Sequence, residues 1–221
     1  MATERQVVEH LRQTLRADAA ILVGSRADGT AREQSDWDCY ALIDDGTGPR
    51  GPSPAPAIID GARIDAGVVH LPVASTDVLR IFGPNLQDAR VLFDTDARAA
   101  QAIVDAAASI YAHGRKLTGA ERTMRAEQMA RNIATMVSRG DEPGPFFEAL
   151  TFIFYTAHRN WYEVLHDSFS KSVHRAMPEI AAQDPAFHTE LLALASSMPK
   201  ERKLSAARAL YARLFGAEDG V

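Results

Sequence analysis

The sequence GSRADGTAREQSDWDCY, residues 24–40, decides how the first half of the chain folds. It follows a short aliphatic run, residues 19–23, which is typical of a buried strand. Gly24 and Ser25 then form a turn of small residues, where an anionic ligand can approach the backbone closely. A second apolar run, residues 37–43, indicates another strand. The stretch therefore predicts two strands joined by a ligand-sized loop.

Two carboxylates stand at the start of the second strand. Because side chains alternate along a strand, Asp36 and Asp38 project from one face, and Trp37 and Cys39 from the other. Neighbouring carboxylates repel one another, and a divalent cation removes the repulsion by using both groups as oxygen ligands. The alternative, an Asx-turn or helix cap beside Ser35, explains one aspartate but not both. The pair favours a site for a metal-bound nucleotide.

The Gly-Ser turn, the spacer and the Asp-x-Asp strand together resemble the signature of the polymerase-beta-like nucleotidyltransferase superfamily. Small two-domain members, such as aminoglycoside and lincosamide nucleotidyltransferases, are the most similar. The resemblance implies an α/β (α+β) nucleotidyltransferase domain with a small mixed sheet, followed by an all-α helical bundle domain. The residues that carry it are Gly24, Ser25, Ala27, Gly29, Ser35, Asp36 and Asp38.

A third carboxylate lies on the next predicted strand, residues 63–71. Asp65 stands among apolar neighbours, so its charge needs a partner. In the superfamily that the chain resembles, an acidic residue on a neighbouring strand completes the metal site, and Asp65 occupies the matching place. The alternative is that Asp65 closes a turn with Gly61 or pairs with Arg63.

The resemblance also implies the chemistry, a Mg²⁺-dependent transfer of a nucleoside monophosphate, AMP from ATP, to a hydroxyl with release of pyrophosphate (an EC 2.7.7-like reaction). Asp36, Asp38 and Asp65 are the implied metal ligands and catalytic residues. Lys171 and Arg175, one turn apart on a predicted helix, would reach the triphosphate unless they are merely solvated. The resemblance implies a base from the helical domain, for which Glu127, Glu148 and Glu163 are the candidates; Asp65 is the alternative. The expected nucleotide-binding residues are Gly24, Ser25, Arg26, Ser35 and Lys171.

Composition limits the classes of partner. Residues 1–112 hold 10 Lys and Arg against 16 Asp and Glu, and the remainder holds 14 against 13. This balance argues against a nucleic-acid-binding face and suits a cationic acceptor. The chain has one cysteine, Cys39, which fits a reducing cytoplasm. It has no apolar run of the roughly 18 residues that span a bilayer.

Hydrophobic periodicity, together with the Gly, Pro and capping residues that end or begin elements, predicts the helices, strands and turns. A Gly- and Pro-rich loop is expected at 44–56, a hairpin turn at Asp60-Gly61, and a capping box at Thr118 and Glu121. The expected domains are a nucleotidyltransferase domain at 1–114 and a helical substrate- or partner-binding domain at 115–221. Strands are expected at 19–23, 37–43, 57–59, 63–71 and 90–93, and helices at 3–16, 74–82, 95–111, 118–138, 146–166, 171–182, 185–197 and 204–215.

The leading functional prediction is a transferase that modifies a small-molecule hydroxyl, such as one on an aminoglycoside-type antibiotic, in a cleft between the domains. One alternative is an antitoxin-type protein adenylyltransferase that acts on a partner protein. The other is a non-catalytic nucleotide-binding scaffold, which the three intact aspartates argue against. A second copy of the chain, completing the cleft in a homodimer, is a further candidate partner.

Overall fold

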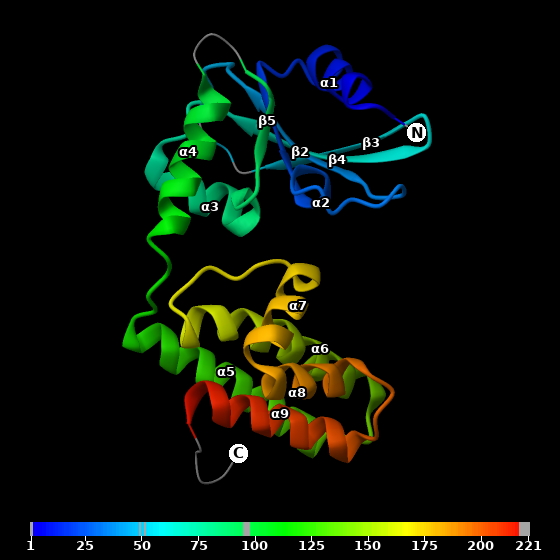
Figure 1. Cartoon of the computed structure of the whole chain (residues 1–221), viewed down its shortest axis with the longest axis vertical. Helices are drawn as coiled ribbons and strands as arrows, with labels where there is room; N and C mark the ends of the chain where they lie inside the picture. The colour runs from blue at the N-terminus through cyan, green and yellow to red at the C-terminus, as the bar shows by residue number, and fades with distance from the viewer. Residues whose placement is uncertain (1, 49, 51, 95–97, 217–221) are drawn as a thin grey trace. The chain divides into compact units, whose positions relative to one another are not determined.

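The computed structural model describes residues 2–48, 50, 52–94 and 98–216. The chain divides into two compact units, Met1–His113 and Gly114–Val221 (Figure 1). Each unit has its own hydrophobic core.

The first unit is built on a five-stranded mixed sheet, as predicted. Its strand order is β3-β4-β2-β1-β5. β2 and β4 run parallel, and the other neighbouring strands run antiparallel. The strands are β1 (Ala19–Val23), β2 (Trp37–Ile43), β3 (Ser53–Ile59), β4 (Ala62–His70) and β5 (Arg90–Phe93).

Helices cover both faces of this sheet (Figure 1). The helix α1 (Glu4–Gln13) packs against the face that carries Trp37 and Cys39. The helices α3 (Val78–Phe82) and α4 (Ala99–Ala112) pack against the opposite face. The predicted alternation along the second strand is therefore confirmed for Trp37 and Cys39.

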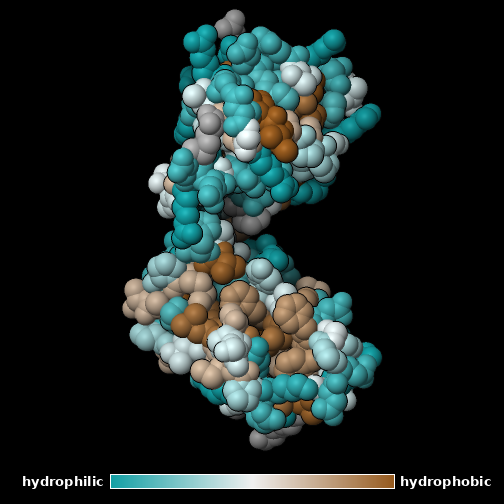
Figure 2. Space-filling view, turned by 90° about the vertical axis from the view of Figure 1, so that its right-hand side faces the viewer, coloured by the Kyte–Doolittle hydropathy of each residue, from teal (hydrophilic) through white to brown (hydrophobic). Residues whose placement is uncertain are grey.

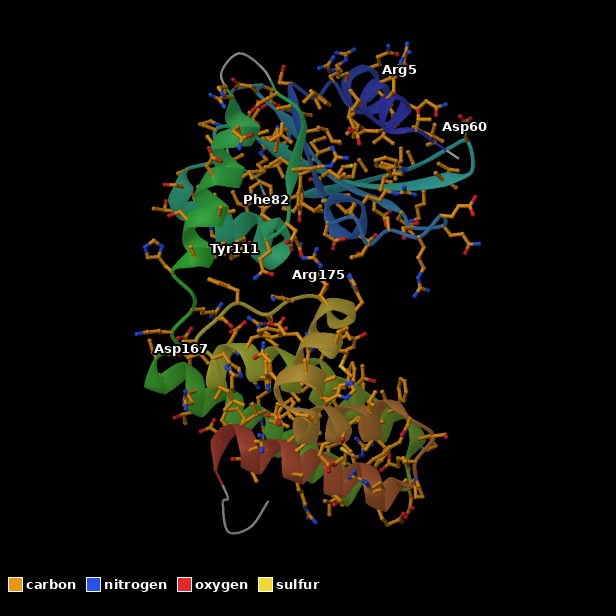
Figure 3. All side chains as sticks on the ribbon, in the orientation of Figure 1. Arg5, Asp60, Phe82, Tyr111, Asp167 and Arg175 are labelled. Carbon is orange, nitrogen blue, oxygen red and sulfur yellow. The ribbon has the colours of Figure 1, made fainter. Side chains whose placement is uncertain are left out.

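The hairpin between β3 and β4 is longer than predicted. The predicted turn at Asp60-Gly61 is confirmed, with φ values of +47° and +76°, and Asp60 is labelled at the hairpin tip in Figure 3. The predicted end of the loop at 44–56 was wrong, because β3 already begins at Ser53 and includes Pro54 and Pro56. β3 is an edge strand, and an edge strand tolerates prolines where the N–H would face outward.

Short helical turns replace some expected loops. The Gly-Ser turn opens α2 (Gly24–Ala27), a helix of four residues. The helix predicted at 74–82 begins as the 3₁₀ turn η1 (Ser75–Asp77), and η2 (Gly83–Leu86) follows α3. The predicted start of the next helix, at 95–97, lies outside the described residues.

In the second unit, the regular elements formed by the described residues are helices. The predicted capping box is confirmed at Thr118 and Glu121, which begin the first of them. Trp161, Ile153 and Phe187 lie at the centre of the core that these helices share. The helices are α5 (Gly119–Ser138), α6 (Pro143–Asn160), the π-helical turn η3 (Trp161–Leu165), α7 (Val173–Gln183), α8 (Pro185–Ala195) and α9 (Lys200–Phe215).

The start of α6 differs from the prediction. A break was expected through Pro145, but the helix begins at Pro143. Proline is favoured in the first turn of a helix, because the N–H that it lacks has no partner there. The second proline, like the first, therefore lies within the first turn.

Apolar side chains gather on the visible face of the second unit (Figure 2). Exposed large hydrophobic residues in this unit include Phe147, which is 67% exposed, Tyr155 and Met198. None of the described helices is long and apolar enough to cross a membrane.

Candidate functional site

Two of the predicted metal ligands lie directly opposite one another. The register of the parallel strands β2 and β4 pairs Asp38 with Asp65. Paired residues in neighbouring strands project from the same face of a sheet. Asp38 is half-buried, and 34% of the Asp65 side chain is exposed. The sheet therefore brings together two carboxylates that are 27 residues apart in the sequence.

Asp36 completes this group from the residue before β2 begins. Its side chain is 42% exposed, and its Oδ2 lies 4.0 Å from Nε of Arg63. The same Nε donates a hydrogen bond of 2.9 Å to Oδ1 of Asp65. We call Asp36, Asp38, Asp65 and Arg63 the carboxylate face. The pairing of Asp65 with Arg63, one of the two alternatives considered above, is present in the structure.

Asp38, in the middle of the carboxylate face, lies in surroundings that disfavour its negative charge. Burial raises the pKa of Asp38, and the negative charges of Asp65 and Asp36 raise it further, whereas Arg63 lowers it. Three carboxylates with one guanidinium leave a surplus of negative charge. A cation bound here would relieve that surplus.

The turn after β1 approaches Asp38 so closely that a side chain would not fit. Gly24 has φ of +69°, and a Cβ at this position would lie 2.5 Å from Oδ2 of Asp38. The register explains the proximity, because Val23 pairs with Asp38. Only glycine combines this backbone conformation with this space. Ser25 follows at the second position of α2 and is partly exposed.

Arg26 and Ser35 hold the loop between β1 and β2. The Arg26 guanidinium donates to the carbonyl oxygens of Ser35 and Asp36, and it stacks over the ring of Trp37 at 4.4 Å. The Ser35 hydroxyl accepts a hydrogen bond of 2.9 Å from the backbone N–H of Arg32. Both residues thus position Asp36 at the start of β2. Their contact with a nucleotide stays a prediction.

Tyr40 extends the same face of β2 beyond Asp38. Its hydroxyl accepts a hydrogen bond from Asn85, and its ring packs edge-on against Phe82, which is labelled in Figure 3. A Cβ on Gly67, its partner in β4, would come within 3.2 Å of the ring, so glycine there makes room for the tyrosine. Sequence reasoning did not single out these residues, because their proximity depends on strand register.

The carboxylate face suits a divalent cation in its donor chemistry. Asp36, Asp38 and Asp65 offer hard carboxylate oxygens on one side of the sheet, which are the ligands that Mg²⁺ prefers. Within the described part of the chain, no group of three His, Cys, Asp or Glu side chains is arranged to hold a metal ion. Mg²⁺ commonly uses one or two carboxylates and takes its other ligands from water and substrate phosphates. The residues present therefore fit a metal that arrives with a nucleotide.

Lys171, the nucleotide-binding residue expected in the second half, belongs to the second unit. The predicted helix start at 171 was wrong, because α7 begins at Val173 and Lys171 lies before it. Its Nζ donates a hydrogen bond of 2.7 Å to Glu179, which also accepts one from the Tyr162 hydroxyl. Burial opposes these bonds, but they outweigh it and lower the pKa of Glu179.

Glu163, one of the glutamates considered as a base, is instead almost completely buried. Its carboxylate is 2% exposed and contacts three guanidinium groups, at 3.2 Å from Arg115, 2.5 Å from Arg125 and 2.8 Å from Arg159. We call these four residues the arginine cluster. Arg125 also donates to the side chain of Asn160. No local sequence pattern indicates this cluster, because glutamate on a helix is usually solvated.

Comparison with known proteins adds little to this site. No family model matches the chain. No curated protein matches it either. Among solved structures, it is similar to a nucleotidyltransferase-like protein from Exiguobacterium sibiricum 255-15, with 14% sequence identity and a TM-score of 0.45, over 97% of this chain and 74% of that one. Such a weak superposition carries no argument about activity.

Proposed function

We propose that this chain is a Mg²⁺-dependent nucleotidyltransferase that transfers a nucleoside monophosphate to a hydroxyl group of a small molecule. AMP from ATP is the proposed donor, and an aminoglycoside-type antibiotic is the proposed acceptor. The proposal draws on the resemblance of residues 24–38 to the superfamily signature and on the arrangement of the first unit. It places the reaction at the carboxylate face.

One observation carries the proposal, namely that Asp38 and Asp65 are paired in register beside a glycine with no room for a Cβ. A structural role for either aspartate needs one partner, and Arg63 supplies it for Asp65. This pairing with Asp65 leaves Asp38 half-buried beside the like charges of Asp36 and Asp65. A half-buried carboxylate whose pKa is raised by burial and by neighbouring carboxylates, as at Asp38, is characteristic of functional sites. The close approach of Gly24 adds a backbone that a phosphate can reach.

In the proposed reaction, carboxylates from the set Asp36, Asp38 and Asp65 would hold the metal together with water and the substrate phosphates. The bound metal would neutralise phosphate charge and lower the pKa of the attacking hydroxyl. Ser25 and the backbone of α2 contact the phosphates. The acceptor oxygen forms a bond to the α-phosphorus, and the bond to the pyrophosphate oxygen breaks. The hydroxyl proton passes to a carboxylate, for which Asp65 is the candidate on the same face.

The acceptor class follows from charge. The first half of the chain carries a surplus of acidic residues, which favours a cationic small molecule over a polyanionic nucleic acid. The carboxylate face itself adds three negative charges against one positive. An amine-bearing acceptor would therefore be attracted to the site, and salt should weaken that attraction.

The test measures pyrophosphate release from ATP and the other nucleoside triphosphates, with Mg²⁺ and a panel of aminoglycosides and lincosamides. The matched control for Asp38→Asn is Asp77→Asn, because Asp77 is a partly buried aspartate of the same unit that pairs with Arg80. We expect release that requires both Mg²⁺ and an acceptor, disappears in Asp38→Asn and persists in Asp77→Asn. Release that survives in Asp38→Asn would refute the proposal. Metal-dependent ATP binding without turnover on the panel would redirect the search to protein acceptors.

A further inference from the structure

The geometry of the carboxylate face assigns a second role to Arg63. We propose that its guanidinium occupies the cation's position on Asp65 and Asp36, so that Arg63 and the divalent metal exclude one another. This inference rests on the proposed function, because it concerns the same metal site. It deepens that function by naming a residue that sets the affinity for the metal.

The first argument is position. A single nitrogen, Nε of Arg63, lies 2.9 Å from Oδ1 of Asp65 and 4.0 Å from Oδ2 of Asp36. It therefore donates a hydrogen bond to one of the three proposed ligands and lies at the outer limit of an ion pair with a second. A metal bound to Oδ1 of Asp65 would compete with the guanidinium for that oxygen, and its charge would be repelled by a guanidinium so close to Asp36. Both cations therefore cannot occupy this position at once.

The second argument is charge. Arg63 is the guanidinium that contacts the carboxylate face, and it lies within 4.0 Å of the carboxylates of both Asp65 and Asp36. One positive charge thus stands beside three carboxylates, where a divalent metal would also be attracted. A guanidinium stays charged at any physiological pH, so this competitor is always present as a cation.

The third argument is that Arg63 is free to leave. Its side chain is 62% exposed, so water can solvate the guanidinium once a metal displaces it. An exposed pair of this kind contributes little, because solvent screens it and the long side chain loses entropy when it is fixed. The competition should therefore tune the affinity for the metal rather than prevent binding.

The experiment titrates the whole protein with Mn²⁺ alone, as a paramagnetic substitute for Mg²⁺, and counts bound ions by electron paramagnetic resonance. The variants are Arg63→Gln, which keeps the stem and removes the charge, and Arg63→Lys, which keeps the charge. The matched control is Arg80→Gln. Arg80 donates from Nε to Oδ1 of Asp77 at 3.0 Å and is 64% exposed, which reproduces the Arg63–Asp65 pair away from the site.

We expect Arg63→Gln to bind Mn²⁺ about two- to fivefold more tightly than the wild type, from the usual strength of an exposed ion pair. Arg63→Lys should fall between them, and Arg80→Gln should equal the wild type. Arg63→Gln should also lower the melting temperature in EDTA, because it removes the counter-charge, and should show a larger rise on adding Mn²⁺.

The outcomes separate this inference from the proposed function. Mn²⁺ binding that requires Asp38 but has equal or lower affinity in Arg63→Gln overturns the competition alone. If neither the wild type nor the Arg63 variants show Asp38-dependent binding, with or without ATP, the metal site and the competition fail together. An equal gain in affinity in Arg80→Gln would reduce the effect to general charge and also overturn the assignment to Arg63.

Discussion

The carboxylate face and the arginine cluster use the same two chemical groups in opposite proportions. In the first unit, three carboxylates share one guanidinium, and the side chains of Asp36, Asp65 and Arg63 are between 34% and 62% exposed. In the second unit, three guanidinium groups share one carboxylate, and Glu163 is 2% exposed. The first arrangement retains negative charge near solvent, and the second surrounds its carboxylate with donors.

The difference separates a candidate site from a structural element. A buried carboxylate that accepts hydrogen bonds from several guanidinium groups is satisfied, and its contacts fix the elements that carry them. Glu163 links η3 to α5 and α6 in this way. The carboxylate face differs, because the charge of Asp38 lies beside the like charges of Asp65 and Asp36. Substitutions should therefore affect activity in one region and stability in the other.

The largest expected effect is on activity, in Asp38→Asn. We expect transfer to fall by about 100-fold or more, because even loss of an outer-shell partner of a metal costs about 10–100-fold. The folded protein should instead gain stability without metal, with a melting temperature about 2–4 °C higher if the gain is ~1 kcal/mol. The two measurements are pyrophosphate release and thermal unfolding in EDTA.

The sign of the stability change follows from the pKa of Asp38. Because folding raises this pKa, the charged carboxylate destabilises the folded state above its ordinary pKa, and the penalty disappears as the pH falls through the raised value. The gain in Asp38→Asn should therefore be present at neutral pH and shrink in acid. A variant that is less stable than the wild type at pH 7 would mean that Asp38 has a structural partner.

The second effect is on stability, in Glu163→Gln. This change replaces the buried carboxylate by an uncharged amide beside three guanidinium groups, of which that of Arg125 is the most buried, with 12% of its side chain exposed. Removing one partner of a buried ion pair typically costs about 3–5 kcal/mol in the free energy of unfolding. The matched control is Glu142→Gln, which breaks the exposed pair with Arg139 and should cost about 1 kcal/mol or less. Urea unfolding measures both, and equal costs would show that the arginine cluster is not a structural core.

A third pair of variants isolates the approach of the turn to Asp38. Gly24 and Gly29 have φ of +69° and +78°, so alanine should cost about 1–2 kcal/mol at either position. Only at Gly24 would the new Cβ displace the carboxylate of Asp38, since no described atom lies within 4 Å of a Cβ at Gly29. We expect similar losses of stability but a loss of Mn²⁺ affinity in Gly24→Ala alone, measured by titration. Equal affinities in the two variants would contradict the proposed part of Gly24 in the site.

Local patterns in the sequence predicted the parts of the fold that depend on neighbouring residues. The first two strands, the capping box at Thr118 and the turn at Asp60 are determined by alternation, hydrogen bonding and backbone preference over a few positions. The pairing of Asp38 with Asp65 depends on the register of two strands, which no local pattern contains. The arginine cluster cannot be predicted locally for a related reason, because Arg115 and Arg125 reach Glu163 from positions 48 and 38 residues earlier in the sequence.

The contact of Lys171 with Glu179 also could not be predicted from local sequence. The variants that test it are expected to change stability least of all. Its pair with Glu179 has one charge of each sign and is partly exposed, so Lys171→Met and Glu179→Gln should each cost about 1 kcal/mol or less. The folded state lowers the pKa of Glu179 from 4.5, so this contribution is present above pH 4.5 and is lost as the pH falls through the folded value. The wild type and Glu179→Gln should therefore differ at neutral pH and converge in acid unfolding experiments.

If Lys171 also binds the triphosphate, as the sequence predicts, Lys171→Met will weaken ATP binding and Glu179→Gln will not, because only the first removes the cation. Equal ATP affinities in the two variants would restrict Lys171 to its pair with Glu179 and leave phosphate binding to the first unit.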